Sequence, residues 1–219
     1  MTAPGDGASA AAVERAWAKR PESARRLFRA AVEVIGEHGY HGTSTRAVAA
    51  RAGLSPAAMY MHFPAKEDLL YQISKTGHEL TLEIVRDAAA SSYDPVARVH
   101  AIVTALVRWH AEHCTIARIL QYEHTSLAPG HRREISALRR RTEAVLREAI
   151  EDGVRTGRFD AAAVPTGELA IMSLAIDVAR WYPAQRRRKP DQIARAYADL
   201  SLRILNWNGG PEVMEPGPG

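Results

Sequence analysis

The sequence predicts an all-α protein, and three observations support this fold class. Apolar residues recur at intervals of three and four, and no segment alternates apolar and polar residues for long. Prolines interrupt the chain where one helix would end and the next begin, at Pro64, Pro95, Pro129, Pro165, Pro183 and Pro190. The composition, 46% hydrophobic and 25% charged, is typical of a globular protein that buries a core. We expect about nine helices, in an N-terminal three-helix domain and a larger C-terminal helical domain.

The first helix is expected over about 22–38, because this segment carries one apolar stripe with helical spacing. The stripe consists of Leu27, Ala31, Val34 and Ile35. Gly39 follows it and can end the helix in a left-handed conformation. The segment therefore predicts an amphipathic helix with one buried face.

The segment 44–63 predicts two short helices joined by a tight turn. The first helix is expected over about 45–52 and the second over about 56–62. Gly53 ends the first helix, and Ser55 is the N-cap of the second, which begins with proline. A helix this short needs packing against its neighbours in order to be stable.

The rest of the chain predicts longer helices, over about 66–90, 95–113, 115–125, 131–155, 166–182 and 190–206. Both ends are rich in small residues, glycine or proline. We therefore divide the chain into a flexible arm (1–20), an N-terminal domain (21–66), a C-terminal domain (67–207) and a disordered tail (208–219).

The composition argues against secretion and membrane insertion. Cys114 is the one cysteine among the 219 residues, so no intrachain disulfide can form, which suits the reducing cytoplasm. The N-terminus lacks the apolar segment of a secretory signal, and no stretch is long enough to span a bilayer. We expect a cytoplasmic protein without a membrane partner.

Positive charge is concentrated near the N-terminus. The segment 20–66 contains seven basic and three acidic residues, which accounts for the whole formal charge of +4. A basic module on a neutral body is the arrangement expected when one end of a protein meets a polyanion.

The segment 45–63 has the proportions of a helix-turn-helix, with a three-residue turn that contains glycine. Its apolar residues can pack together: Val48, Ala49, Leu54, Met59 and Phe63. The second helix then presents mainly small residues, which let its backbone approach the major groove of DNA closely.

The stretch "GYHGTSTRAVAARAGLSPAAMYMHFPAKEDLL" (39–70) resembles the tetracycline-repressor (TetR) family of transcriptional regulators. The resemblance is specific over about 22–75, and the matching positions include Gly39, Tyr40, Thr43, Thr45, Ala49, Gly53, Tyr60, Phe63, Lys66, Leu69 and Leu70. Beyond residue 75 only the number and length of the helices agree. The resemblance implies a ligand-responsive repressor, and no enzyme.

The resemblance also implies roles for individual residues. Tyr60 and Lys66 would donate to DNA phosphates, with further backbone contacts from Thr45 and His62. Arg46 matches a position that reads guanine, and a bidentate arginine–guanine pair gives roughly 1–3 kcal/mol of discrimination. Apolar contacts would come from Pro56, Ala57, Ala58 and Met61.

One recognition helix covers about one half-site, so specific binding to a palindromic operator generally needs a two-fold dimer. The last two helices are apolar on much of their surface and, in the family, form a four-helix bundle between subunits. The predicted interface residues are Leu169, Met172, Ser173, Ile176, Ile193, Tyr197, Leu200 and Ile204. Alternatively, these helices only close the core of their own chain.

The middle helices would hold a pocket for a small-molecule effector. The predicted lining consists of Leu106, Trp109, Ile116, Leu120, Tyr122, Val145, Ile171, Ala175, Arg180 and Trp181. Such a lining suits an apolar ligand with a few polar anchors, although each position is also compatible with ordinary core packing.

The sequence leaves the effector open. The segment 175–205 loosely resembles regulators that sense acyl-CoA or other CoA thioesters, and the basic run 186–189 could meet a CoA phosphate or be a solvated loop. His110 and Cys114 share a helical face, but two ligands do not make a zinc site, so we expect no metal and no cofactor. A constitutive architectural DNA-binding protein and, less well supported, a helical enzyme are the alternative functions.

Overall fold

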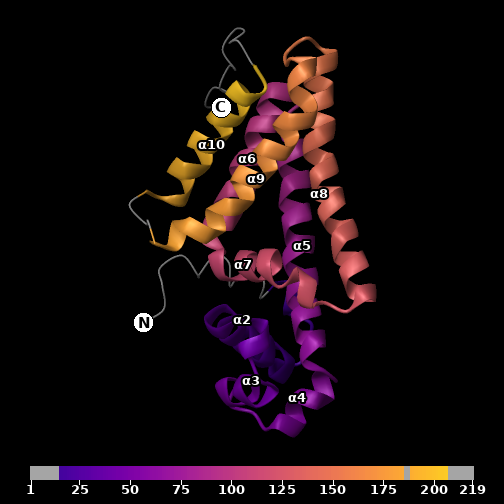
Figure 1. Cartoon of the computed structure of the whole chain (residues 1–219), viewed down its shortest axis with the longest axis vertical. Helices are drawn as coiled ribbons and strands as arrows, with labels where there is room; N and C mark the ends of the chain where they lie inside the picture. The colour runs from indigo at the N-terminus through magenta and orange to yellow at the C-terminus, as the bar shows by residue number, and fades with distance from the viewer. Residues whose placement is uncertain (1–14, 185–187, 207–219) are drawn as a thin grey trace.

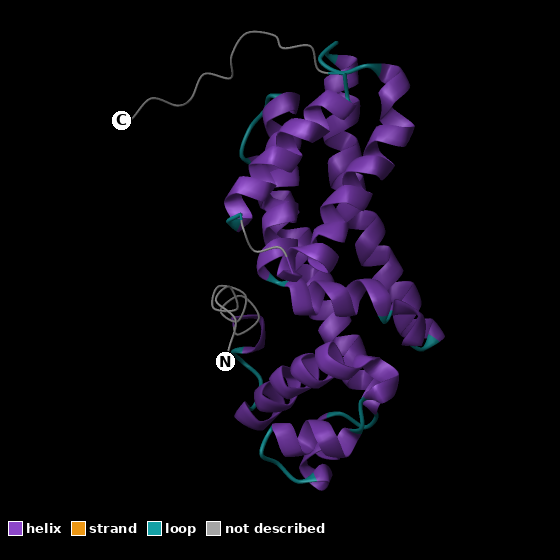
Figure 2. Ribbon diagram, turned by 60° about the vertical axis from the view of Figure 1, so that its left-hand side comes forward, coloured by secondary structure: helices purple, strands orange, loops and turns teal. Residues whose placement is uncertain are grey.

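The computed structural model describes residues 15–184 and 188–206, and these residues form helices joined by short loops (Figures 1 and 2). The N-terminal unit consists of α2 (Glu22–Gly42), α3 (Thr45–Arg51) and α4 (Pro56–His62). The body consists of α5 (Lys66–Ala90), α6 (Pro95–Glu112), α7 (Cys114–Tyr122), α8 (Pro129–Arg155), α9 (Val164–Trp181) and α10 (Pro190–Ile204), with short 3-10 turns at His124–Ser126, Ala161–Ala163 and Tyr182–Ala184. The predicted all-α class is confirmed.

The chain breaks where the turn residues predicted it would. Gly39 has φ +68°, so α2 is kinked there and continues for one more turn to Gly42. Gly53 has φ +64° in the turn between α3 and α4, and a Cβ at this position would lie 2.6 Å from Nη2 of Arg26. The positive φ at Gly53 favours glycine, and a side chain there would also displace the Arg26 guanidinium.

Serines cap the two short helices. Ser44 accepts a hydrogen bond from the backbone N–H of Ala47, and Ser55 accepts one from Ala58. The seven-residue helix α4 contributes Met59 to the core, and this side chain is fully buried. Caps and core contacts therefore stabilise a helix that would be marginal alone.

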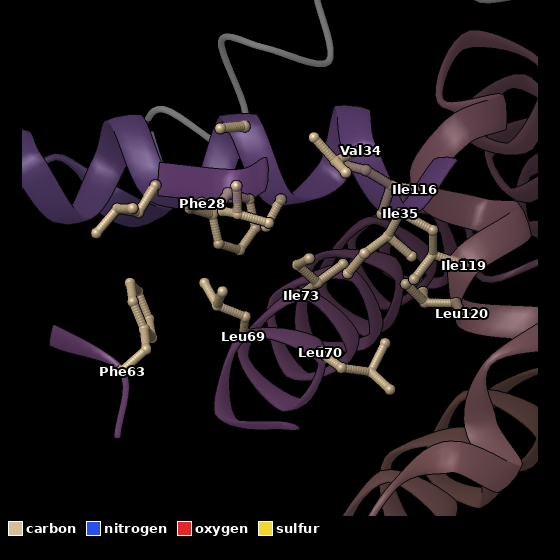
Figure 3. Close-up of a cluster of buried hydrophobic side chains, with 14 of the residues drawn as sticks. Phe28, Val34, Ile35, Phe63, Leu69, Leu70, Ile73, Ile116, Ile119 and Leu120 are labelled. Carbon is tan, nitrogen blue, oxygen red and sulfur yellow. The ribbon is translucent and has the colours of Figure 1, made fainter. Parts of the chain in front are cut away.

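One hydrophobic cluster joins the N-terminal unit to the body. Side chains of α2, α5 and α7 meet in it, with Val34 and Ile35 facing Ile73 and Ile119 (Figure 3). A second cluster fills the body between α6, α8, α9 and α10. The predicted domain boundary at residue 66 therefore does not separate two independent cores. Helix α5 supplies buried residues to both clusters.

The predicted flexible arm of residues 1–20 is shorter than expected at its C-terminal end. Trp17 is buried, its ring lies 4.2 Å from that of Phe28, and its Nε1 donates to Oγ1 of Thr76 at 3.0 Å. Sequence periodicity missed this contact because Trp17 precedes the first amphipathic helix. Residues 1–14 and the predicted tail 208–219 lie outside the described residues.

Candidate DNA-binding site and effector cavities

Two arginines hold the helix-turn-helix against α2. Arg51 on α3 donates to Glu33 at 3.0 Å and to Glu37 at 3.1 and 2.9 Å. The hydrogen bond from Arg51 lowers the pKa of the Glu37 carboxyl. Arg26 on α2 donates to the two carbonyls of the α3–α4 turn. These contacts fix the angle between the helices, and neither arginine has a role that the sequence predicts.

The outer face of α4 is apolar and exposed. Met61 is 79% exposed and Tyr60 is 50% exposed, and Pro56 and Ala57 beside them are also exposed. Ala58 is partly covered. This small, protruding face is consistent with close approach to a groove, as the sequence predicted.

Tyr60 also joins the two short helices. Its hydroxyl lies 3.2 Å from Oγ1 of Thr45, the first residue of α3. Both groups are predicted phosphate-backbone contacts, and a hydroxyl can both donate and accept. The structure therefore brings the two residues together at one edge of the surface.

His62 and Lys66 are engaged within the protein. Nε2 of His62 lies 2.6 Å from Oγ of Ser23, which ties the end of α4 to the start of α2. Nζ of Lys66 donates to the carbonyls of Tyr40 and Thr43, both at 2.9 Å, and lies 4.2 Å from the centre of the Tyr40 ring. Lys66 thus has a structural role that the sequence did not reveal, and the phosphate contact predicted for it would fall to its third N–H.

Arg46 differs from the other basic residues of this unit. The segment 20–66 contains seven basic residues. Within the described part of the chain, six of them make a hydrogen bond, ion pair or ring contact, and Arg46 makes none. It lies exposed in the first turn of α3. Its guanidinium is therefore available to an external partner without first losing an internal one.

A cavity of about 620 Å³ opens between α5 and α6 beside residues 15 and 16. Its apolar wall consists of Leu80, Ile84 and Trp109, and its charged rim consists of Arg15, Glu83, Asp87, Arg108 and Glu112. Burial raises the pKa of Glu112, and the nearby Arg108 opposes this shift. A cavity of this size can hold a small organic ligand.

Most of the predicted effector residues are placed elsewhere. Trp109 lines this cavity, and Val145 lines a second cleft of about 460 Å³ between α5, α6 and α8. The other eight residues line neither of the two. They divide between core positions (Leu106, Ile116, Leu120, Ile171 and Ala175), a half-buried ring that stacks on Tyr197 (Trp181), and surface positions (Tyr122 and Arg180). Helical spacing identified buried faces, but it does not distinguish a cavity wall from a filled core.

The predicted dimer residues also divide into two groups. Met172 and Ile193 are buried in the core of their own chain, which corrects their assignment to an interface. Leu169, Ser173 and Leu200 are exposed, and Ile176, Tyr197 and Ile204 are partly buried. Leu174 is exposed on α9 as well, and the prediction had omitted it. The α9–α10 surface therefore has exposed apolar side chains, among them Leu169, Leu174 and Leu200.

Two histidines of the body, the buried His110 and the partly buried His78, are uncharged in the folded protein. Burial lowers the pKa of His78 to about 3, with Arg139 adding to the shift. Burial lowers the pKa of His110 to about 4, and its Nδ1 donates to the carbonyl of Leu106. The sulfhydryl of Cys114 donates to the carbonyl of Ala111 at 2.9 Å. Among the described residues, no three His, Cys, Asp or Glu side chains form a cluster that could hold a metal ion.

A short exposed helix held by a capped turn on a basic three-helix unit defines a helix-turn-helix DNA-binding protein. Family models for "Tetracyclin repressor-like, C-terminal domain" and "Bacterial regulatory proteins, tetR family" match residues 92–205 and 27–73. The chain belongs to the TetR family and is a DNA-binding transcriptional regulator. Among the described residues, no helix is both long and apolar enough to cross a membrane.

Similar proteins extend the match over most of the chain. A tetR-family regulatory protein from Rhodococcus RHA1 has a solved structure with 40% identity and a TM-score of 0.81, covering 84% of this chain and 97% of that one. The transcriptional repressor KstR2 of Rhodococcus jostii RHA1 is 28% identical over 80% of this chain and 87% of its own length. The fatty acid metabolism regulator of Bacillus subtilis is 40% identical over 57 residues, 26% of this chain and 29% of that relative. AibR, solved with isovaleryl coenzyme A and operator DNA, shares the fold, with 24% identity and a TM-score of 0.75 over 82% of this chain and 97% of that one.

Proposed function

We propose that the protein is a cytoplasmic repressor that binds a palindromic operator as a homodimer and is released by a small hydrophobic effector. The observation that carries the proposal is the position of Trp109. This side chain lines the 620 Å³ cavity and also belongs to the hydrophobic cluster that contains α2 and the start of α5. A ligand packed against Trp109 would act on the same core that positions the helix-turn-helix.

Contacts of α7 supply the route from the body to the DNA-binding unit. A Cβ on Gly77 of α5 would lie 2.7 Å from Leu120, and one on Gly36 of α2 would lie 2.5 Å from Thr115. Such close contacts leave little room for independent movement, because packed interiors transmit displacement. Movement of α7 would therefore displace α2 and α5 together.

Acyl-CoA esters are the first effector class to test. The apolar wall of the cavity suits an acyl chain, and AibR, whose fold this chain shares, was solved with isovaleryl coenzyme A. Of the basic run 186–189, Arg186 and Arg187 lie outside the described residues. Arg180 pairs with Asp177 at 2.7 Å, so this guanidinium is already occupied. The cavity also weighs against a constitutive architectural protein, for which a filled body is expected.

The test is release of DNA by ligand. An operator is first selected from random duplexes with the full chain, and its affinity is measured by fluorescence anisotropy with acyl-CoA esters of increasing length, free CoA and free fatty acids. We expect one series to weaken binding at least about tenfold, which corresponds to roughly 1.4 kcal/mol of coupling.

Ala105 lines the cavity, so Ala105→Leu should fill it and abolish release while operator binding persists. Ala137→Leu, at a partly buried position of α8 that lines neither this cavity nor the second cleft, is the matched control and should respond like the wild type. Release that is equal in both variants would place the effector elsewhere, and no release by any ligand class would contradict the proposal.

A further inference from the structure

The second cleft, of about 460 Å³, is lined by more basic than acidic side chains. Three arginines from three helices line it: Arg86 on α5, Arg98 on α6 and Arg141 on α8. Glu148 is the one acidic residue among the lining side chains. Figure 1 shows α5 and α8 side by side in the body, with α6 beside them. Residues distant in sequence are thus brought together as a positive site.

The protein itself neutralises only part of the charge of this cleft. Within the described residues, Arg86 and Arg141 have no hydrogen bond or ion pair. Arg98 donates from Nη1 to Asp152 at 2.7 Å, but its Nε is buried without a hydrogen-bond partner in the part of the chain that is described. A buried donor without a partner costs about 1–3 kcal/mol, so an acceptor from outside would be stabilising.

The remaining lining explains the hollow shape. Ala89, Ala90, Ala144 and Val145 are small and leave space between the three helices. They also offer an apolar surface beside the guanidinium groups. A ligand that matches both features has an anionic head and a flat or apolar portion.

We propose that this cleft binds the phosphate ester of a nucleotide-sized ligand. Guanidinium groups present paired N–H donors that match phosphate oxygens, and such charge-assisted bonds are stronger than neutral ones. The volume falls within the range of about 300–1,000 Å³ for small-molecule sites and exceeds the size of inorganic phosphate alone. The apolar floor accommodates the base or another ring.

The location separates this site from the DNA-binding surface. Arg86 lies twenty residues along α5 from Lys66, which corresponds to about 30 Å of helix. The larger cavity uses another face of the same helix, through Leu80, Ile84 and Asp87. The inference therefore concerns a second site, and it does not depend on the hydrophobic effector proposed above.

The experiment is calorimetric titration of the full chain with ADP, adenosine, CoA and inorganic phosphate. ADP should bind with a dissociation constant below about 1 mM, and adenosine at least about tenfold more weakly, because it lacks the phosphates. If CoA also binds, and Arg86→Gln and Arg141→Gln weaken its binding as they weaken that of ADP, CoA is one source of the phosphate ester. If ADP binds and CoA does not, the ligand is a free nucleotide.

Arg86→Gln and Arg141→Gln should each weaken ADP binding at least about tenfold, since each removes a guanidinium from the cleft. Arg140→Gln is the matched control, because Arg140 is exposed next to Arg141 on α8 and does not line the cleft. Equal binding of adenosine and ADP, equal loss in all three variants, or no binding of ADP or CoA up to about 1 mM would overturn the proposal. Release of the operator by acyl-CoA esters is measured separately, so the two proposals can fail independently.

Discussion

Replacement of Arg46 by alanine tests the proposed reading of DNA directly. Arg46 is exposed and, among the described residues, has no internal partner. Its removal should therefore change the free energy of unfolding by no more than about 0.5 kcal/mol. Any loss of DNA binding by Arg46→Ala then reports on the interface with DNA.

The magnitude of the loss follows from the symmetry of the complex. One bidentate arginine–guanine pair contributes about 1–3 kcal/mol of base discrimination. TetR regulators bind operator DNA as dimers, so the substitution removes two such contacts and should cost about 2–6 kcal/mol. At the lower end this is a loss of about 30-fold in operator affinity. Random DNA offers no matched guanine and should lose much less.

The assay is fluorescence anisotropy with the selected operator and a random duplex of equal length, repeated at several salt concentrations. Thermal unfolding of Arg46→Ala checks that the fold is retained, and Arg140→Ala on the body controls for the loss of one positive charge. An equal loss on both duplexes, with a salt slope that is flatter by about one unit per subunit, would mean that Arg46 contacts phosphate only. That result would refute the base-reading role.

Two further predictions concern stability. His78 and His110 are uncharged in the folded protein, with pKa values of about 3 and about 4, whereas an unfolded histidine protonates near pH 6.5. The unfolded state therefore binds more protons than the folded state below about pH 6.5, and the free energy of unfolding should fall by up to about 4 kcal/mol between pH 7 and pH 5. Urea denaturation of His78→Gln should show about half of this fall. An unchanged dependence on pH in this variant would contradict the argument from burial. A Cβ at Gly153 would lie 2.0 Å from Cδ2 of the buried Phe159, whereas at Gly130 it would meet nothing within 4 Å. Overpacking costs about 1–3 kcal/mol, whereas the higher helix propensity of alanine stabilises a helix by at most about 1 kcal/mol. Gly153→Ala should therefore lower the melting temperature, and Gly130→Ala should not. Equal melting temperatures of the two variants would contradict the close packing at Gly153.

Much of the helical architecture could be predicted from the sequence, because it depends on local signals. Helical periodicity, the prolines, Gly53 and the serine cap of α4 all act within a few residues. The contacts of Arg26 and Arg51 could not be predicted in this way, because they join residues that are distant in sequence. Arg51, for example, donates to Glu33 and Glu37 on another helix. Lys66 was given a DNA contact by resemblance, and only the three-dimensional structure places the carbonyls of α2 within its reach.

The candidate effector residues were harder to predict than the DNA-binding surface. An exposed recognition helix needs small outer residues and a buried anchor such as Met59, and both are visible in sequence. A cavity is the absence of side chains between helices, and its walls have the same apolar spacing as a core. Leu106 and Trp109 therefore looked alike in sequence, although in the structure Trp109 lines the 620 Å³ cavity and Leu106 is buried in the core.

Helix α5 connects the proposed sites physically. Its first turns contribute Leu69, Leu70 and Ile73 to the core beneath the helix-turn-helix, and all three are fully buried. Farther along, one part of its surface lines the 620 Å³ cavity and another part lines the arginine cleft. Because its first turns pack closely against α2, and α2 contacts α4, displacement of α5 by a ligand would move the helix-turn-helix with it. Helix α5 would then have one position in the DNA-bound protein and another in the released protein. A ligand at either site changes operator affinity only to the extent that it binds one of these positions more tightly than the other. The two ligands would oppose or reinforce each other according to which position of α5 each one favours.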